Sequence, residues 1–189
     1  GLPVITRKQW WETCVPRWAH LEPREYDLAE FPFGFKNKVV VDYGIGGGWF
    51  GKALFDQGIK KYIGIDIADR SIKKAKETLK GYNCEFLKAP CSLDIGADIL
   101  ISLACIQHFT EDYFYYFLTE LNISGIPILG LQIRRGKLKF DPQNVIYSCY
   151  AEPNNLSEIL KNYTLVSVSK TYKENNYQYL RFSLNDIQL

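Results

Sequence analysis

Hydrophobic residues follow two different spacings along this chain, and the change of spacing separates strands from helices. Largely apolar runs at residues 39–41, 61–67 and 97–103 are typical of strands buried on both faces. Between them, residues 49–57 and 69–80 carry apolar side chains at helical spacing. Strands that alternate with helices predict an α/β fold with a mostly parallel sheet.

The second half of the chain continues this alternation and then ends differently. Thr110 is a suitable N-cap for a helix, and two acidic residues follow it in the first turn. The polar stretch 173–176 separates two alternating segments, which predicts a closing antiparallel hairpin. The other expected elements are strands at 84–87, 125–133, 163–171 and 177–184 and helices at 111–121 and 153–161.

The first 37 residues differ in composition from the rest, because aromatic residues stand there among charges and prolines. A short helix is expected within 6–19, bent or ended by Pro16. We interpret 1–37 as an aromatic cap on a domain formed by 38–189. The aromatic side chains either pack on the core or form a lid that excludes water from a ligand cleft.

Composition narrows the functional classes. The chain has 189 residues, which suits one domain with a sizeable core, and a net charge of only +2, which gives no general attraction to nucleic acid or anionic membranes. No run of 18 apolar residues predicts a membrane span. Five cysteines without a C-x-x-C pair, together with two histidines, predict reduced thiols, a cytoplasmic location and no metal site.

The most informative stretch is KVVVDYGIGGGWFGK at 38–52. Asp42 closes the first strand, four glycines lie within the next six residues, and a helix is expected from Trp49. Glycines allow the backbone to approach a ligand closely, and a helix start offers unpaired N–H groups. This arrangement predicts a site for a nucleotide-like ligand.

Two glycine patterns overlap in this stretch. Gly46-x-Gly48-x-x-Gly51 matches the dinucleotide fingerprint, but it begins four residues after Asp42 instead of directly after the strand. An acid at that strand end would also repel a pyrophosphate. The same acid suits a ligand that carries an amine and a sulfonium.

Counted from Asp42, the glycines stand at offsets two, four and six, and the segment resembles motif I of class I S-adenosylmethionine-dependent methyltransferases. Asp66, 22 residues after Gly44, stands where an acid binds the ribose hydroxyls. The resemblance covers about 38–184. It implies a Rossmann-like, doubly wound, seven-stranded sheet with an antiparallel C-terminal hairpin, and S-adenosylmethionine as cofactor with S-adenosylhomocysteine as product.

The resemblance also implies a site. The glycine turn with Asp42 would hold the methionine moiety, Asp66 the ribose, and 90–92 the adenine, although Pro90 stands where many members carry an acid. The end of the fourth strand would lie near the sulfur. The cofactor-binding residues expected on this basis are Asp42, Tyr43, Gly44, Ile45, Gly46, Gly48, Asp66, Ile67, Pro90, Cys91, Ser92, Ser102 and Leu103.

His108 is the candidate general base, and the alternative is that it packs at a helix start. A small-molecule acceptor methylated on oxygen or nitrogen is expected, because the Asn/Asp-Pro-Pro-Tyr/Phe signature of many base-methylating enzymes is missing after the fourth strand. The alternatives are an NAD-dependent oxidoreductase and a non-catalytic partner subunit that binds the cofactor. The basic residues of 134–139 are expected in an exposed loop, with an anion site for the substrate as the alternative.

Overall fold

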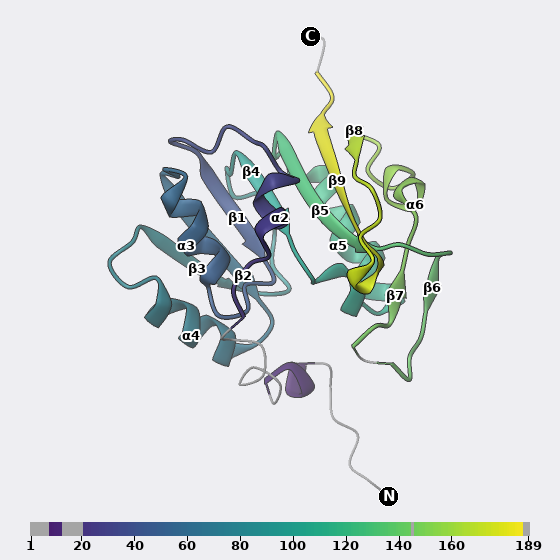
Figure 1. Cartoon of the computed structure of the whole chain (residues 1–189), viewed down its shortest axis with the longest axis horizontal. Helices are drawn as coiled ribbons and strands as arrows, with labels where there is room; N and C mark the ends of the chain where they lie inside the picture. The colour runs from purple at the N-terminus through teal and green to yellow at the C-terminus, as the bar shows by residue number, and fades with distance from the viewer. Residues whose placement is uncertain (1–7, 13–20, 145, 187–189) are drawn as a thin grey trace, which may run out of the picture. The chain divides into compact units, whose positions relative to one another are not determined.

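A computed structural model describes residues 8–12, 21–144 and 146–186, and Figure 1 labels its elements. Seven strands form one sheet in the order β3-β2-β1-β4-β5-β9-β8. Their bounds are β1 Val39–Tyr43, β2 Lys61–Asp66, β3 Cys84–Lys88, β4 Ile99–Ser102, β5 Ile128–Arg134, β8 Tyr163–Val168 and β9 Tyr177–Leu184. The helices are α2 Glu25–Ala29, α3 Trp49–Asp56, α4 Asp69–Thr78, α5 Glu111–Ile123 and α6 Pro153–Ser157, with 3₁₀ turns η1 Ile106–His108 and η2 Glu174–Asn176.

The strand directions confirm the predicted fold class. β1, β2 and β3 run parallel to one another, and so do β4 and β5. β9 is antiparallel to both β5 and β8, which makes the closing hairpin. The sheet is therefore mostly parallel with an antiparallel C-terminal pair.

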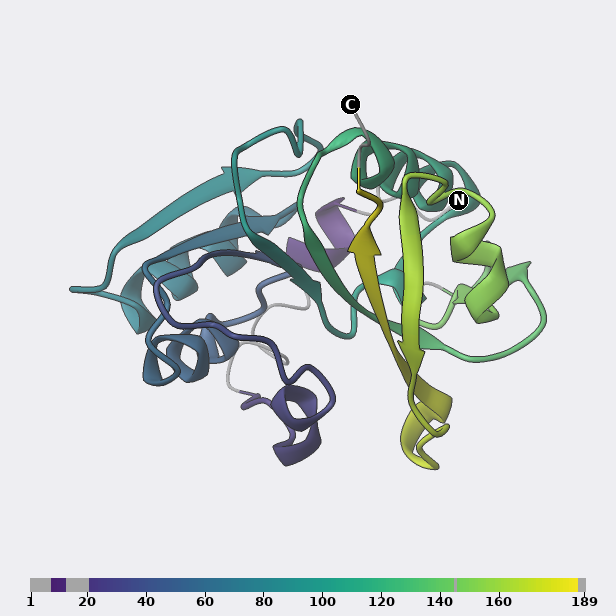
Figure 2. The same cartoon turned by 90° about the horizontal axis from the view of Figure 1, so that it is seen from above.

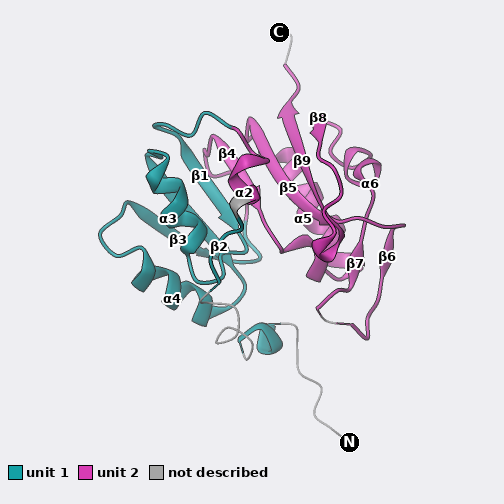
Figure 3. Ribbon diagram, viewed as in Figure 1, with its two compact units in different colours: residues 1–25, 33–91 teal, residues 26–32, 92–189 magenta. Residues whose placement is uncertain are grey.

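The chain divides into two compact units, residues 1–25 with 33–91 and residues 26–32 with 92–189 (Figure 3). In the first unit, α3 and α4 meet where Gly48 lies against Ala75. Gly51 of α3 lies against the ring of Tyr62 in β2. These close approaches hold both helices near the strand ends that carry the glycine turn and Asp66.

In the second unit, β8 and β9 run side by side to the turn formed by η2 (Figure 2). Thr110 caps α5 as expected, since its Oγ1 accepts a hydrogen bond of 3.3 Å from the Tyr113 N–H. Helix α2 joins this unit through Tyr26, whose ring stacks on Tyr172 at 4.3 Å between ring centres. The N-terminal segment interpreted as one cap thus contributes residues 26–32 to the second unit.

Several expected boundaries were wrong. β4, α6 and β8 are each shorter than predicted. The buried Ala97 and Leu160 extended the apolar pattern beyond β4 and α6, whereas the residues that follow β8, at 169–171, are polar. The connection after β5 is not a plain loop, since β6 Lys139–Phe140 pairs with β7 Cys149–Tyr150. Of the helix expected within 6–19, residues 8–12 are helical and the remainder lies outside the described residues. Within the described ranges, no helix has the length and apolar character needed to cross a bilayer.

Candidate functional site

Two glycines of the turn between β1 and α3 have different surroundings, one open and one closely packed. Gly46 has φ +54°, and a Cβ placed on it would meet nothing within 4 Å. Gly48 has φ +86°, and a Cβ there would lie 3.0 Å from both Cα and Cβ of Ala75. Gly46 is therefore the position where a ligand can approach the backbone, whereas Gly48 lets α4 pack against the turn.

Asp42 ends up inside the protein, with 2% of its surface exposed. Its Oδ2 accepts a hydrogen bond of 2.6 Å from the hydroxyl of Tyr62 on the neighbouring strand. In the register of the sheet Asp42 lies beside Gly64, so its side chain projects from the same face as those of Tyr62 and Asp66.

Sequence analysis did not identify Tyr62, whose position depends on two glycines. A Cβ on Gly51 would lie 2.6 Å from the Tyr62 ring, and one on Gly64 would lie 2.8 Å from it. The missing side chains therefore leave room for a large ring to lie along β2 and reach Asp42. The pattern Tyr-x-Gly in a buried strand was a signal, but the partner glycine comes from α3.

Asp66 is half-buried and connects the two motifs directly. Its Oδ2 accepts a hydrogen bond of 3.0 Å from the Ile45 N–H of the glycine turn, and its Oδ1 accepts one of 2.9 Å from the Ala68 N–H. Each carboxylate oxygen has two lone pairs, so both can accept a further hydrogen bond from a ribose hydroxyl. The arrangement fits a nucleoside placed over the turn.

Both acids hold their protons more tightly than usual. Burial raises the pKa of Asp42 to about 7; the Tyr62 hydroxyl acts against this, and the charge of Asp66 adds to it. Burial also raises the pKa of Asp66 to about 6, against backbone N–H groups that include those of Ala68 and Ile45. A cationic ligand favours the ionised form of both carboxyls, so it would bind with release of protons near neutral pH.

The loop after β3 lies next to this pair of motifs. The Ala89 N–H donates a hydrogen bond of 2.8 Å to the backbone oxygen of Asp66, which fixes the loop to the end of β2. Pro90 and Ser92 are exposed and Cys91 is half-buried. Their predicted contact with adenine stays a prediction.

The described part of the N-terminal segment lies over the loop that follows Asp66. Trp11 packs against the buried Ala68, and the Glu12 carboxylate accepts hydrogen bonds from the N–H groups of Asp69 and Arg70 at the start of α4. Residues 8–12 therefore cover the loop after β2, as either a cap or a lid would. Trp18 lies outside the described residues.

The expected sulfur-facing residues belong to the second unit. Ser102 ends β4 fully buried, and Leu103 follows it half-buried. The next residue, Ala104, has φ +49°, a left-handed conformation that costs a non-glycine residue about 1–2 kcal/mol. Its N–H donates to Oε1 of Gln132 on β5, which holds the strained turn in place. Sequence analysis did not identify Gln132, which lies inside an apolar strand.

His108 is positioned by two polar contacts. Its Nδ1 faces the backbone oxygen of Ile146, and its Nε2 lies 3.3 Å from the side-chain nitrogen of Gln107. A hydrogen on Nδ1 donates to the carbonyl, and the Gln107 amide then donates to Nε2. This tautomer is neutral and carries its lone pair on Nε2, the form that a general base needs. The base role stays a prediction.

Comparison with known proteins identifies the fold's family. Residues 40–122 match the family model described as a methyltransferase domain, and no curated protein matches the chain in sequence. That match contains the glycine turn, Asp66 and the turn after β4. Residues 40–122 are therefore assigned to the methyltransferase-domain family, and the solved structures that share the fold include S-adenosylmethionine-dependent methyltransferases. These findings support S-adenosylmethionine as the cofactor of this chain.

Solved structures share the fold of this chain at low identity. A Synechocystis magnesium protoporphyrin IX methyltransferase with bound S-adenosylhomocysteine is 16% identical, with a TM-score of 0.64 over 98% of this chain and 90% of that one. A candidate methyltransferase of Haloferax volcanii, in complex with the activator Trm112, is 13% identical, with a TM-score of 0.72 over 97% and 100%.

A Rhodobacter sphaeroides protein described as a candidate zinc-dependent alcohol dehydrogenase is 12% identical to this chain. Its TM-score is 0.76, over 97% of this chain and 100% of that one. At such identities the likeness concerns the fold alone, so this structure does not favour the oxidoreductase alternative.

Proposed function

We propose that this methyltransferase transfers a methyl group from S-adenosylmethionine to oxygen or nitrogen of a small-molecule acceptor. The observation that carries the proposal is the hydrogen bond between the Ile45 N–H and Asp66. It joins the glycine turn to the carboxylate that is predicted to bind the ribose hydroxyls. Bound S-adenosylmethionine supplies an activated methyl group on a sulfonium, so the protein has mainly to align an acceptor and exclude water.

In the proposed site, the turn around Gly46 leaves space for the methionine moiety, and the ionised Asp42 favours its positive charges from inside the protein. Asp66 accepts the ribose hydroxyls, and Pro90, Cys91 and Ser92 line the adenine. The remaining proposed cofactor-binding residues are Tyr43, Gly44, Ile45, Gly48, Ile67, Ser102 and Leu103.

His108 is the proposed base for an acceptor hydroxyl or ammonium group. Because its Nε2 lies next to the Gln107 amide, an acceptor would have to displace that amide before it could give up its proton to the imidazole. Replacing His108 with alanine should therefore lower turnover by about 10²–10⁴-fold and leave cofactor affinity unchanged. A protein in which His108 only packs would keep its turnover.

Titration calorimetry with S-adenosylhomocysteine, S-adenosylmethionine, NAD and NADP tests the cofactor part of the proposal. We expect saturable binding of the two adenosyl ligands and none of the dinucleotides. The variant Gly46→Val should lose that binding because its side chain occupies the open space at φ +54°. Retained affinity in a folded Gly46→Val protein would place the ligand elsewhere.

A second candidate is a subunit that binds the cofactor and acts with a protein partner. Its support is the Haloferax volcanii structure, which is a complex with an activator protein. Cofactor binding without turnover by the isolated chain, restored by a co-purified partner, would favour this alternative.

A further inference from the structure

Arg134 ends β5 with its guanidinium group among aromatic rings. The guanidinium carbon lies 3.9 Å from the centre of the Tyr147 ring and 5.0 Å from that of Tyr150. Cation–π contacts of this kind hold the charged group in place, but they provide no acceptor for its N–H groups. The expectation of an exposed basic loop is therefore wrong for Arg134, which is half-buried.

Two of the three guanidinium nitrogens of Arg134, Nε and Nη1, are buried and have no hydrogen-bond partner. The ion pairs found among the described residues do not include this side chain. An arginine stays charged in proteins, and buried donors without acceptors are costly. The side chain can therefore bind an anionic ligand through these N–H groups.

An unpaired acceptor belongs to the same group of residues. Arg134 lies opposite Tyr177 in the antiparallel register of β5 and β9, so the two side chains project from one face. The Tyr177 hydroxyl accepts a hydrogen bond of 3.1 Å from the Gln107 amide nitrogen, while Oε1 of Gln107 is buried without a partner. The cluster thus offers unpaired donors and one unpaired acceptor.

The position of this cluster is also that of a ligand site. Gln107 lies in η1, which follows the carboxyl end of β4, and Arg134 is the last residue of β5. These two strands are parallel, so both unpaired groups lie at the carboxyl edge of the sheet, where α/β folds bind their ligands.

We propose that Arg134 binds a carboxylate of the methyl acceptor and that Gln107 Oε1 accepts a hydrogen bond from a neighbouring hydroxyl or amine of the same molecule. The proposal rests on the proposed methyltransferase function and names its substrate class. A guanidinium binds a carboxylate edge-on, through Nε with Nη2 or through Nη1 with Nη2, and each of these edges contains one of the two unpaired nitrogens of Arg134. The carboxylate serves for recognition, because pairing with arginine makes it a poorer nucleophile.

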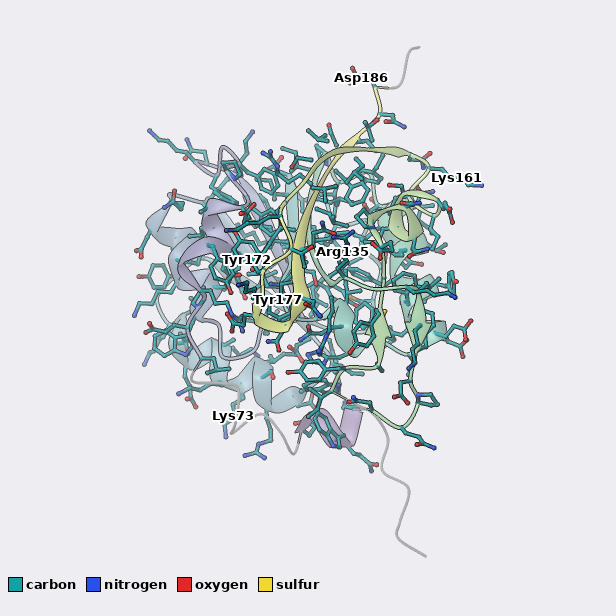
Figure 4. All side chains as sticks on the ribbon, turned by 45° about the vertical axis from the view of Figure 1, so that its right-hand side comes forward. Lys73, Arg135, Lys161, Tyr172, Tyr177 and Asp186 are labelled. Atoms are coloured by element: carbon teal, nitrogen blue, oxygen red, sulfur yellow. The ribbon has the colours of Figure 1, made fainter. Side chains whose placement is uncertain are left out.

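Charge favours a carboxylate over a phosphate. Arg134 supplies one positive charge, which matches a monoanion. The adjacent Arg135, labelled in Figure 4, is already engaged. Its Nε donates to Glu152 at 3.2 Å and its Nη1 donates to Thr171 at 3.1 Å. A phosphate dianion would need a second available cation.

The probes are benzoate, benzamide and phenyl phosphate, which share one ring and carry a carboxylate, a neutral amide and a phosphate. Each is titrated into the full chain saturated with S-adenosylhomocysteine. We expect benzoate to bind at least tenfold more tightly than benzamide, with phenyl phosphate no tighter than benzoate. Equal affinities for benzoate and benzamide, no benzoate binding, or tighter binding of phenyl phosphate would overturn the proposal.

Two neighbouring arginines provide a matched pair of variants. Arg134→Gln should lower benzoate affinity at least tenfold, and Arg135→Gln should leave it unchanged. Arg134→Lys keeps the charge without the planar fork and should lose part of the affinity, so it serves if the glutamine variant does not fold. Full benzoate affinity in either Arg134 variant would contradict the inference. Wild-type protein that fails to bind S-adenosylhomocysteine would instead contradict the proposed function.

Discussion

The hydroxyl of Tyr62 changes the pKa of the buried Asp42. Its hydrogen bond to Asp42 lowers a pKa that burial has raised to about 7, so it increases the ionised fraction at neutral pH. The ring reaches Asp42 only because Gly51 and Gly64 leave space for it. Tyr62 is therefore a positioning residue for the predicted methionine site.

The variant Tyr62→Phe removes the donor and keeps the ring. The pKa of Asp42 should rise further, so less of it is ionised at pH 7, and S-adenosylhomocysteine should bind about three- to tenfold more weakly there than to wild type. The deficit should shrink at pH 8.5, where Asp42 ionises in both proteins. Calorimetry at both pH values measures this, with the exposed Tyr82→Phe as control. An unchanged affinity at pH 7 would show that the hydroxyl does not tune the site.

Asp66 is expected to bind both ribose hydroxyls. Asp66→Ala should weaken S-adenosylhomocysteine binding by about 1.5–3 kcal/mol, the range for hydrogen bonds to a charged group. Asp69→Ala is the control, because Asp69 is exposed and pairs with Lys88 at the surface. The dissociation constant is read by calorimetry, and a folded Asp66→Ala protein with normal affinity would remove Asp66 from the site.

At the scale of elements, the turn after β4 depends on a buried chain of hydrogen bonds. Gln132 accepts from the Ala104 N–H, donates to the Tyr179 hydroxyl at 2.7 Å, and that hydroxyl donates to Asp27 of α2. Helix α2 and the strained turn are thus connected through β5 and β9. This explains why the short helix α2 belongs to the second unit.

Gln132→Leu should leave the Ala104 N–H and the Tyr179 hydroxyl without their partner. We expect the free energy of unfolding to fall by about 1–3 kcal/mol, as for buried groups left unsatisfied. Urea denaturation measures the change, and the exposed Gln143→Leu is the control, expected within about 0.5 kcal/mol of wild type. Equal losses in the two variants would mean that the hydrogen-bond chain does not hold the turn.

At the scale of the whole molecule, the two raised carboxyl pKa values predict how stability depends on pH. The folded protein binds protons on Asp42 and Asp66 up to about pH 7 and 6, whereas the unfolded chain releases them near pH 4. Between those values the folded state holds more protons, so its stability falls as pH rises.

The ligand-free protein should therefore lose stability between pH 4 and pH 7, by up to about 1.4 kcal/mol per pH unit for each group. Asp42→Asn cannot ionise and should show a shallower decline over that range. Denaturation series at pH 4.5, 5.5, 6.5 and 7.5 on both proteins give the two slopes. Parallel slopes would indicate that Asp42 titrates with an ordinary pKa.

The sequence by itself determined the order of elements and the position of the glycine turn. Apolar runs and helical spacing are local, and so is the phase of the glycines after Asp42, which is why β1, α3, β2 and β9 were predicted closely. Asp66 was also selected as a candidate from its separation along the chain. Each of these features depends only on residues that are close together in the sequence.

Only the tertiary structure decided which distant side chains meet. Tyr62 reaches Asp42 through space left by glycines of two elements, and Gln132 holds a turn 28 residues before it. Arg134 lies in a basic stretch that predicts a surface loop, yet its guanidinium contacts the rings of Tyr147, in the β6–β7 connection, and Tyr150, in β7. Burial and hydrogen-bond partners depend on strand register and packing, and a local pattern does not contain them.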